Sequence, residues 1–283
     1  MITASKYHGC GNDFIIVDYE AVKQLDAGIL AQNVCDRHTG IGADGLIIVK
    51  QNPLEMIFYN CDGSRAPMCG NGIRCFARYV YDMHICEQEQ FDVVTLAGIL
   101  SVNILQKDPF LVEIMMGQPD YDPAMIKTQP LQKIEDYPIE IDGTMYYLTS
   151  FFMGTIHTMV FVEHALDKQL EIIGKKLHDH PLFSEKTNVN FVQVVDEHQL
   201  YVRTYERGVG MTLACGTGCC ASAVAAWKKG YTKNHVRVLL EKGFLDIRIE
   251  ADETIYMSGP AQQVMKGAQI YDERFNSSIS NTI

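Results

Sequence analysis

Met68-Cys69-Gly70-Asn71-Gly72 and Ala214-Cys215-Gly216-Thr217-Gly218 are two short segments with one pattern: a cysteine, a glycine, a polar residue and a second glycine. Each segment opens an apolar run whose three- and four-residue spacing predicts a helix, over 71–82 in the first case and over 217–229 in the second. A thiol therefore stands at the beginning of a helix twice in one chain. This placement predicts two acid/base groups around a single substrate.

The similarity between the two halves extends beyond the cysteines, which lie 146 residues apart. Further pairs at an offset of 145 or 146 residues are Gly98 with Gly243, Asn60 with Glu206, and the apolar run 46–49 with the run 191–194. A repeat at nearly constant spacing indicates that one structural unit occurs twice. Each half is therefore predicted to contain strands, then the Cys-Gly-X-Gly turn and its helix, then more strands.

Length and composition agree with two domains. The chain has 283 residues, 47% hydrophobic and 21% charged, which is enough apolar material for two ordinary cores. We expect an N-terminal domain at 1–117, a C-terminal domain at 118–266, and a last segment, 267–283, that returns to the first domain. The proline-rich stretch 118–138 is predicted to be the crossover between the domains.

Strand-like runs outnumber helical patterns, which indicates an α+β architecture. Besides the two helices that follow the cysteines, apolar spacing predicts helices over 21–35 and 166–178.

The charge of the chain argues against several classes of partner. A net charge of −11 and an isoelectric point near 5.2 disfavour binding to nucleic acid or to an anionic membrane surface. No apolar run approaches the length of a membrane span, and residues 1–6 do not begin a secretion signal. We therefore expect a cytoplasmic protein that acts on a small molecule.

The nine cysteines do not follow the spacing of a disulfide scaffold, and their number is odd. Reduced thiols in a cytosolic protein are the simplest interpretation. Structural zinc sites need paired Cys-x₂₋₄-Cys knuckles, and only Cys215 and Cys219 have that spacing, without a second knuckle or a nearby histidine pair. We therefore expect no metal site.

The two helix beginnings suit acid/base chemistry on an amino acid. A helix N-terminus presents unpaired N–H groups and about half a positive charge, so it lowers the pKa of a thiol and attracts a carboxylate. If the helices face each other, one thiolate can remove the α-proton of a bound amino acid while the other thiol delivers a proton from behind, inverting the configuration. The same N–H groups would stabilise the planar intermediate, so no cofactor is required. Neither segment has the Lys-Ser/Thr of a phosphate-binding P-loop, which disfavours a phosphate site.

Several further motifs occur in the order of one enzyme family. They are Gly9-Cys10-Gly11-Asn12-Asp13-Phe14, Asp36-Arg37-His38, Gly40-Ile41-Gly42-Ala43-Asp44-Gly45, Asn60 with Asp62-Gly63-Ser64, Gly72-Ile73-Arg74-Cys75, Asn188-Val189-Asn190-Phe191 and Glu206-Arg207-Gly208. Together with the two cysteine segments, these motifs make the chain resemble the diaminopimelate epimerases from Lys6 to about Gly267. The resemblance implies two pseudo-symmetric domains, each a β-barrel-like mixed sheet wrapped around a central helix.

The resemblance also implies an activity. Diaminopimelate epimerases are isomerases that convert the LL form of their substrate to the meso form without pyridoxal phosphate or another cofactor, in the synthesis of lysine and peptidoglycan precursors. A homodimer is implied as well. Two alternatives stay open: a racemase of the same fold that acts on a different amino acid, and a catalytically silent protein that binds an amino acid.

Individual residues acquire expected roles from the same resemblance. Cys69 and Cys215 are the expected acid/base thiols, which His157 and Glu206 are expected to tune. Residues expected to bind the reacting end of the substrate are Asn12, Gly70, Asn71, Gly216 and Thr217. Residues expected to bind the distal amino-acid centre are Asn60, Thr155, Asn188, Glu206 and Arg207. The planar fork of arginine suits a carboxylate there, and glutamate suits an ammonium.

The chain departs from the family pattern at positions that bear on the substrate. Gly154-Thr155-Ile156-His157 stands where the family usually has Gly-Asn-Pro-His, so a side-chain amide is replaced by a hydroxyl. Met211 stands where an acidic residue is usual. These changes leave the thiol chemistry intact and concern only which amino acid is bound.

Overall fold

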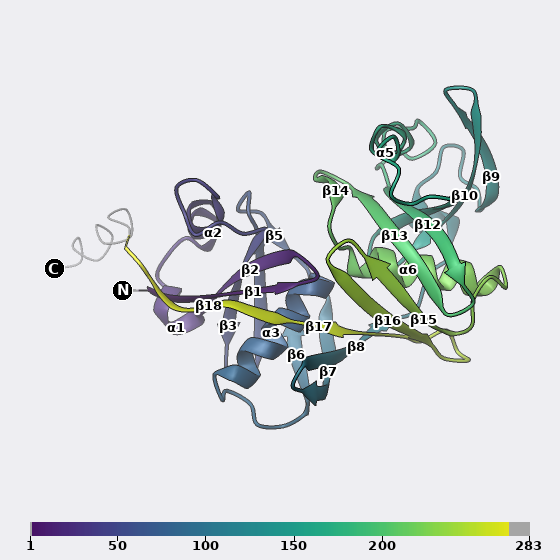
Figure 1. Ribbon diagram of the computed structural model, residues 1–283. Coiled ribbons are helices and arrows are strands. Elements are labelled where there is room, and N and C mark those ends of the chain that lie inside the picture. The colour runs from purple at the N-terminus through teal and green to yellow at the C-terminus, as the bar shows by residue number, and fades with distance from the viewer. Residues whose placement is uncertain (1, 272–283) are drawn as a thin grey trace. The chain divides into compact units, whose positions relative to one another are not determined.

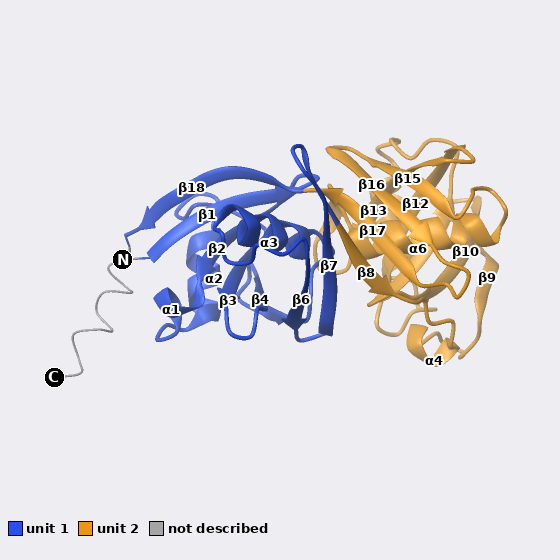
Figure 2. Ribbon diagram, turned by 90° about the horizontal axis from the view of Figure 1, so that it is seen from below, with its two compact units in different colours: residues 1–112, 261–283 blue, residues 113–260 orange. Residues whose placement is uncertain are grey.

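The computed structural model describes residues 2–271, which form two compact units (Figures 1 and 2). Unit 1 comprises residues 1–112 together with 261–283, and unit 2 comprises residues 113–260. Within residues 2–271, no helix is both long and apolar enough to cross a membrane.

Unit 1 is made mainly of strands. Its strands are β1 (Ile2–Gly9), β2 (Asn12–Asp18), β3 (Gly45–Lys50), β4 (Glu55–Asn60), β5 (Arg65–Ala66), β6 (Gln90–Thr95), β7 (Gly98–Lys107) and β18 (Gln262–Ile270). Its helices are α1 (Tyr19–Val22), α2 (Ala27–Cys35) and α3 (Gly70–Asp82). Strand β8 (Phe110–Gly117) begins in unit 1 and continues into unit 2.

Unit 2 has the same composition. Its strands after β8 are β9 (Ile134–Ile141), β10 (Thr144–Phe152), β11 (Ile156–Phe161), β12 (Asn188–Asp196), β13 (Gln199–Glu206), β14 (Gly210–Thr212), β15 (His235–Leu240), β16 (Gly243–Ile249) and β17 (Ile255–Pro260). Its helices are α4 (Pro123–Ile126), α5 (Leu170–His178) and α6 (Gly216–Lys228).

Strand pairing repeats from one unit to the other, as the sequence repeat predicts. In unit 1, β2 pairs with β3 in parallel, β3 with β4 antiparallel, β4 with β6 in parallel, and β6 with β7 antiparallel. In unit 2, β11, β12, β13, β15 and β16 follow one another with the same sequence of directions. Gly98 and Gly243 begin the second strands of the equivalent hairpins, and both have positive φ, 113° and 154°. The fold is thus α+β, with a mixed sheet in each of two pseudo-symmetric units.

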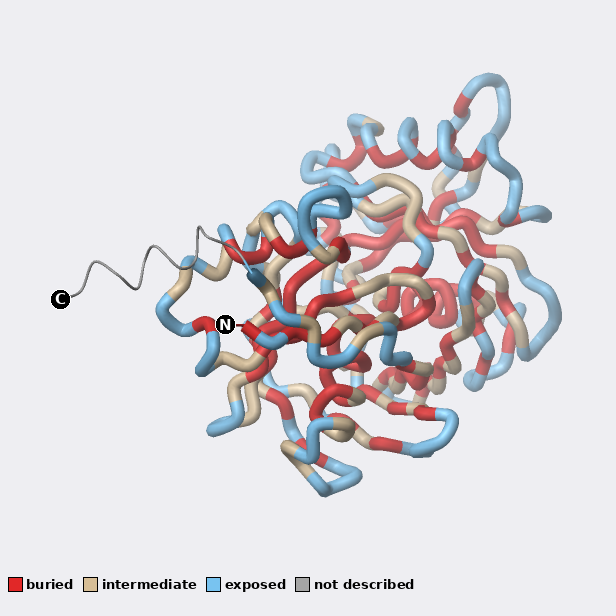
Figure 3. The backbone as a smooth tube through the Cα atoms, turned by 60° about the vertical axis from the view of Figure 1, so that its left-hand side comes forward, coloured by how far each residue is buried: buried red, intermediate tan, exposed pale blue. Residues whose placement is uncertain are grey.

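One helix lies at the centre of each unit. Helix α3 contacts β1, β2, β3, β4 and β18, whereas α6 contacts β11, β12, β13, β15, β16 and β17. Ten of the 13 residues of α6 are buried, and most are Gly, Ala, Cys or Ser, whose small side chains let strands approach on every side. Figure 3 shows that buried residues concentrate in the strands and in these central helices, while the connecting loops are exposed.

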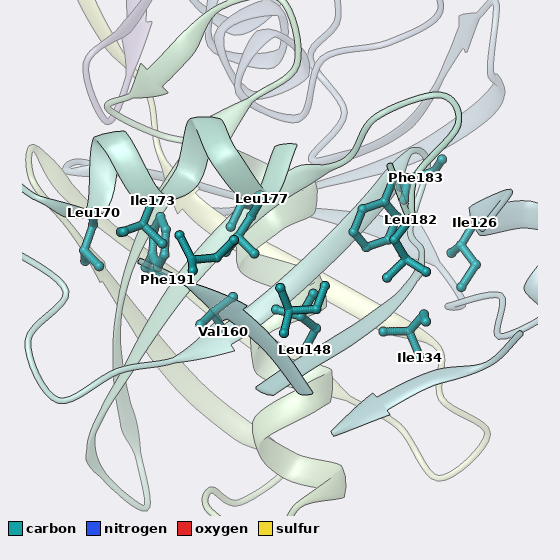
Figure 4. Close-up of a cluster of buried hydrophobic side chains, with 14 residues drawn as sticks. Ile126, Ile134, Leu148, Val160, Leu170, Ile173, Leu177, Leu182, Phe183 and Phe191 are labelled. Atoms are coloured by element: carbon teal, nitrogen blue, oxygen red, sulfur yellow. The ribbon is translucent and has the colours of Figure 1, made fainter. Parts of the chain in front are cut away.

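The outer surface of each sheet is covered by smaller helices. In unit 2, α5 turns Leu170, Ile173 and Leu177 toward Val160 and Phe191 of the sheet (Figure 4). Helix α2 does the same in unit 1 with Leu30, Val34 and Cys35, against β3 and β4. Burial of one such Leu or Ile side chain contributes about 1.5–3 kcal/mol.

The division into units differs in detail from the expected domain boundaries at 117/118 and 266/267. It falls at 112/113 and 260/261, because β8 contributes Glu113 onward to unit 2, where β8 pairs with β17, and because all of β18 pairs with β1. The stretch 118–138, expected to be a crossover, belongs to unit 2, where Ile126 and Ile134 are part of a buried apolar cluster. Most of the expected returning segment, from residue 272 to the end, lies outside the described residues.

The prediction of one continuous helix over 21–35 is wrong, because residues 23–26 are not helical. Two helices occupy this region, α1 and α2, because the Asp26 side chain accepts a hydrogen bond from the Ile29 backbone N–H at 3.0 Å and starts a new helix. Similarly, α5 begins at Leu170 rather than at the predicted 166.

Candidate active site

Both cysteines of the repeated turn immediately precede a helix. Cys69 precedes α3 with φ −135° and ψ 122°, and Cys215 precedes α6 with φ −121° and ψ 107°. Each cysteine carbonyl accepts the first helical hydrogen bond, at 2.9 Å, from Ile73 N–H and Cys219 N–H respectively. Each sulfur thus stands beside the positive end of a 13-residue helix, where an anion is stabilised by the helix dipole.

In unit 1, the Cys69 thiol contacts Asn12, which is hydrogen-bonded to Asn71. Both asparagines were expected to bind substrate. Asn12, at the start of β2, accepts at its Oδ1 from Asn71 Nδ2 at 3.1 Å and from the Cys69 thiol at 3.8 Å. The Asn12 amide group in turn donates to Asp44 Oδ2 at 2.5 Å. Since Asp44 can only accept when ionised, this contact fixes which atom of Asn12 faces Cys69.

A buried arginine, whose role the sequence did not indicate, holds Asn71 in place. Arg74 is 0% exposed and donates to Asn71 Oδ1 at 2.8 Å and to the Gly70 carbonyl at 3.0 Å. The Arg74 guanidinium leaves no space at Gly9, where a Cβ would lie 2.9 Å from Nη2. Arginine at an apolar position of a helix, four residues after Gly70, is the sequence signal that could have identified this contact.

Charged side chains brace the loop that carries Asn12. Arg37 binds both oxygens of Asp13, at 2.7 and 3.1 Å, and also reaches Asp44 at 2.9 Å, while Lys6 lies 2.8 Å from Asp13. Burial alone would raise the pKa of Asp13, but the hydrogen bonds from Arg37 and Lys6 outweigh burial and lower it. Asp44 therefore supports Asn12 as part of a charged network.

The position of Asn60 is set by a local turn. Its amide donates to Ser64 Oγ at 2.9 Å, and its backbone N–H donates to the Ser64 carbonyl at 2.9 Å, at the end of β4. The turn thus orients the Asn60 side chain within unit 1. Its role in binding the distal centre stays a prediction.

In unit 2, a series of polar side chains leads to Cys215. His157 on β11 is 0% exposed, and its Nε2 lies 3.0 Å from Thr217 Oγ1. Thr217 Oγ1 lies 3.7 Å from the Cys215 sulfur. His157 and Thr217, expected in two different roles, are therefore parts of one arrangement beside the thiol.

The surroundings of Cys215 act on its pKa in opposite directions. Burial raises the pKa of the Cys215 thiol well above its ordinary value, and the charge of Glu206 raises it further, whereas the Thr217 hydroxyl and the Gly218 N–H lower it. Glu206 itself accepts a hydrogen bond from Thr212 Oγ1 at 2.6 Å. The thiol is thus the stable form of Cys215 in unit 2, and a thiolate there depends on the donors that face it.

The remaining candidates of unit 2 gather at the ends of adjacent strands. Asn188, 6% exposed at the start of β12, accepts at Oδ1 from the Arg207 backbone N–H at 2.8 Å. The Arg207 side chain is exposed, and its Nη1 donates to the Glu185 carbonyl at 3.0 Å. Thr155 follows Gly154, which has a φ of 72° and where a Cβ would lie 3.5 Å from the Thr217 methyl. The turn that carries Thr155 therefore lies against the first residues of α6.

The second glycine of each Cys-Gly-X-Gly turn, Gly72 or Gly218, has a different amount of space around its Cα. This difference predicts different effects of an added methyl group. A Cβ at Gly218 would lie 2.4 Å from Asn190 Oδ1, whereas at Gly72 the nearest atom would be Cys69 Cβ at 3.2 Å. We expect Gly218→Ala to lower the free energy of unfolding by about 1–3 kcal/mol through overpacking. Gly72→Ala should be nearly neutral, because alanine also favours the helix by about 0.5–1 kcal/mol. Urea unfolding of both variants tests this, and equal losses would contradict it.

Burial of His157 predicts an effect of pH on stability. Desolvation lowers the pKa of His157 to about 3 in the folded protein, below its ordinary value of 6.5. Its contribution to stability is therefore fully present above pH 6.5 and is lost as the pH falls toward 3, because only the unfolded chain binds the proton. We expect the stability advantage of the wild type over His157→Gln to shrink by about 1.4 kcal/mol per pH unit between pH 6 and 4. Urea titrations at successive pH values measure it, and a constant difference would refute it.

Within residues 2–271, no group of three or more His, Cys, Asp or Glu side chains is arranged to hold a metal ion. The polar groups near Cys69 and Cys215 are amides, hydroxyls, one neutral imidazole and the carboxylate of Glu206, which suit proton transfer.

Solved structures with the same fold define the class of protein. The chain matches a probable proline racemase from Agrobacterium radiobacter K84 with a TM-score of 0.68, 13% identity, and coverage of 98% of this chain and 94% of the other. It matches a PhzF-family phenazine biosynthesis protein from Bacillus anthracis with a TM-score of 0.67, 15% identity, and coverage of 95% and 99%. At these identities the likeness shows the fold alone, and it places the chain in the class of proteins with this fold.

Sequence relatives identify the family within this class. The diaminopimelate epimerase profile matches residues 4–121 and 149–264. The diaminopimelate epimerase of Caldanaerobacter subterraneus is 42% identical over 269 residues, covering 93% of this chain and 97% of the relative. That of Synechocystis is 39% identical over 275 residues, covering 94% and 98%. The chain belongs to the diaminopimelate epimerase family.

Proposed function

We propose that this chain converts LL-diaminopimelate to meso-diaminopimelate by exchange of one α-proton between two thiols. The observation that carries the proposal is the repeated helix beginning, with Cys69 before α3 and Cys215 before α6, in a chain 42% identical to a diaminopimelate epimerase. One thiolate removes the α-proton and the other thiol supplies a proton to the opposite face. Backbone N–H groups at Gly70 and Gly216 then stabilise the charge that develops on the carboxylate, so no cofactor takes part.

The side chains near each thiol support separate tasks. In unit 1, Asn12 and Asn71 have amides fixed by Asp44 and Arg74, which suits them to bind the reacting carboxylate and ammonium. In unit 2, Thr217 faces Cys215, and Glu206 adds negative charge close to it. Asn60, Thr155, Asn188, Glu206 and Arg207 are assigned to the distal amino-acid centre.

The direct test is solvent-deuterium incorporation at Cα, followed by NMR, with LL-diaminopimelate and reduced enzyme in D₂O without added cofactor. We expect deuterium uptake together with formation of the meso form. Enzyme alkylated beforehand with iodoacetamide serves as the control and should show neither. Absence of uptake by reduced enzyme would refute the proposed activity.

A second candidate is a racemase for another amino acid, and Thr155 is the observation that favours it. The hydroxyl of Thr155 offers fewer hydrogen bonds to a distal zwitterion than the amide that is usual in the family. A panel of amino acids with a single stereocentre, assayed by the same deuterium exchange, separates the two activities. Exchange with a member of the panel and none with diaminopimelate would establish the alternative.

Two further properties complete the proposal. We place the enzyme in the cytoplasm, where reducing conditions keep catalytic thiols reduced, and in the supply of lysine and peptidoglycan precursors. We also propose that it is a homodimer, as the family resemblance implies. The mass of one chain is 31.9 kDa. Sedimentation velocity at micromolar concentration should therefore show one species of twice this mass, and a species of one chain mass would contradict the dimer.

A further inference from the structure

One buried polar residue beside the site has no assigned role: Asn190, on β12. It is 0% exposed and lies between β11 and β13, opposite Met159 on one side and Thr204 on the other. A buried amide without partners is costly, so its contacts must be specific. Its Nδ2 lies 3.1 Å from His157 Nδ1 and 3.4 Å from the Thr158 carbonyl oxygen, and its Oδ1 accepts from Thr204 Oγ1 at 3.0 Å.

These contacts determine which way the Asn190 amide faces. A backbone carbonyl can only accept a hydrogen bond, so the atom beside the Thr158 oxygen must be the NH₂ group. The same NH₂ group then points a hydrogen at His157 Nδ1, which must carry a lone pair. A neutral imidazole has one N–H, so its proton resides on Nε2, the atom that faces Thr217.

The tautomer of His157 determines the direction of the next hydrogen bonds in the series Asn190, His157, Thr217, Cys215. His157 Nε2–H donates to Thr217 Oγ1, so the Thr217 hydroxyl hydrogen can point at the Cys215 sulfur, 3.7 Å away. A donor at this sulfur favours the thiolate over the thiol. The burial of His157, which lowers its pKa to about 3, keeps the ring neutral and preserves this direction at ordinary pH.

The equivalent positions of unit 1 lack this series. At an offset of 145 residues Gly45 corresponds to Asn190, so no side-chain amide is present there, and a Cβ at Gly45 would lie 2.6 Å from the Phe58 ring. There, Asn71 donates toward Asn12, and Cys69 also faces the acceptor oxygen of Asn12. In these contacts Cys69 faces an acceptor oxygen, whereas Cys215 faces a hydroxyl that can donate to it.

We propose that Asn190, held by Thr204 and the Thr158 carbonyl, is a positioning residue that fixes His157 as the Nε2–H tautomer, so that Thr217 donates to the Cys215 sulfur. The role rests on the proposed function, because it matters whenever Cys215 becomes a thiolate during turnover. Other groups that act on this sulfur are Glu206 from β13 and Cys219 from α6, which oppose the thiolate, and the Gly218 N–H, which favours it.

Two nearly isosteric substitutions separate the steps of this series. Asn190→Asp replaces the NH₂ donor by an acceptor, so His157 should move its proton to Nδ1, and Thr217 should then donate to Nε2 instead of to the sulfur. Thr217→Val removes only the last hydroxyl and should leave the tautomer of His157 unchanged. Ser222→Ala is the control, since Ser222 is buried on α6 and donates to the Gly218 carbonyl at 2.7 Å outside this series.

Both measurements are made without substrate. Long-range ¹H–¹⁵N spectra of protein labelled in histidine, with His157 assigned from His157→Gln, report the tautomer. Alkylation of Cys215 between pH 7 and 10, followed by mass spectrometry of its peptide, reports how readily the thiolate forms. We expect Nε2–H in the wild type and Thr217→Val, Nδ1–H in Asn190→Asp, and alkylation of Cys215 about tenfold slower in both variants, as for a pKa raised by about one unit.

The outcomes distinguish this proposal from the proposed function. An Nδ1–H tautomer in the wild type, or unchanged alkylation in both variants, would overturn the role of Asn190 even if diaminopimelate is epimerised. The expected tautomers with no turnover of diaminopimelate would leave the role of Asn190 standing and reject only the substrate. If Asn190→Asp does not fold, Thr217→Val and the wild-type spectrum still decide the direction of the series.

Discussion

Replacement of Cys69 or of Cys215 by alanine is expected to lower kcat for diaminopimelate by about 10³-fold, because a positioned acid or base contributes about 10²–10⁴-fold to the rate. Both losses should be of this size, since inversion needs a base on one face of Cα and an acid on the other. KM should change little, because the backbone N–H groups that follow each cysteine remain. Single-turnover conversion of the LL to the meso form, followed by chiral chromatography, provides the rates.

The matched control for these variants is Cys86→Ala. Cys86 is a partly buried thiol that follows α3 at its opposite end, away from the glycine turn. It should retain wild-type activity. If either Cys69→Ala or Cys215→Ala kept more than a tenth of the activity, the exchange of a proton between two thiols would have to be abandoned.

Arg207→Met is the substitution with the next largest expected effect, on substrate selection. One of the five guanidinium N–H donors of Arg207 is used by the Glu185 carbonyl, at 3.0 Å, and the exposed side chain can offer others to a carboxylate. Loss of hydrogen bonds to a charged group costs about 1.5–3 kcal/mol, so kcat/KM for diaminopimelate should fall by about 100-fold. The fall should reside in KM, because the distal carboxylate is bound equally in the ground state and the transition state.

Arg237→Met is the control for a lost surface arginine. Arg237 binds Asp246 through two hydrogen bonds of 2.7 and 2.8 Å across the β15–β16 hairpin, away from the strand ends that carry the site. Exposed ion pairs of this kind contribute at most about 1 kcal/mol, so its kinetic constants should match the wild type. Initial rates over a range of concentrations give both constants. An unchanged KM in Arg207→Met would remove Arg207 from the distal binding set.

The repeated Cys-Gly-X-Gly segment allowed the two-unit architecture to be predicted from the sequence. A constant offset of 145 or 146 residues predicted two units with the same order of elements, and the pairing of β2–β3–β4–β6–β7 with β11–β12–β13–β15–β16 confirms it. Both central helices were predicted to within one residue of their observed starts, because glycine and cysteine mark the turn and apolar spacing marks the buried faces.

Two strands, β9 and β18, could not be read in the same way. Strand β9 lies partly within a proline-rich stretch, and β18 has mostly exposed side chains, so neither was identified as a strand from the sequence. Each exists because a neighbouring strand, β10 or β1, supplies its hydrogen bonds. Pairing between distant segments is decided by the assembled sheet, and no local preference predicts it.

For the site, the sequence by itself predicted the two thiols and the glycines that follow them, and it indicated the family to which the chain belongs, since these depend on residue type and spacing. Only the tertiary structure decided how polar neighbours act on each thiol. Asn190 is distant in sequence from His157, which it orients, and Arg74 lies within the apolar pattern of a helix. Both side chains are 0% exposed. Hydrogen-bond direction depends on which donors and acceptors are brought within about 3 Å of one another. That selection is made by strand register and helix packing, and it gives two similar turns different polar neighbours at their sulfurs.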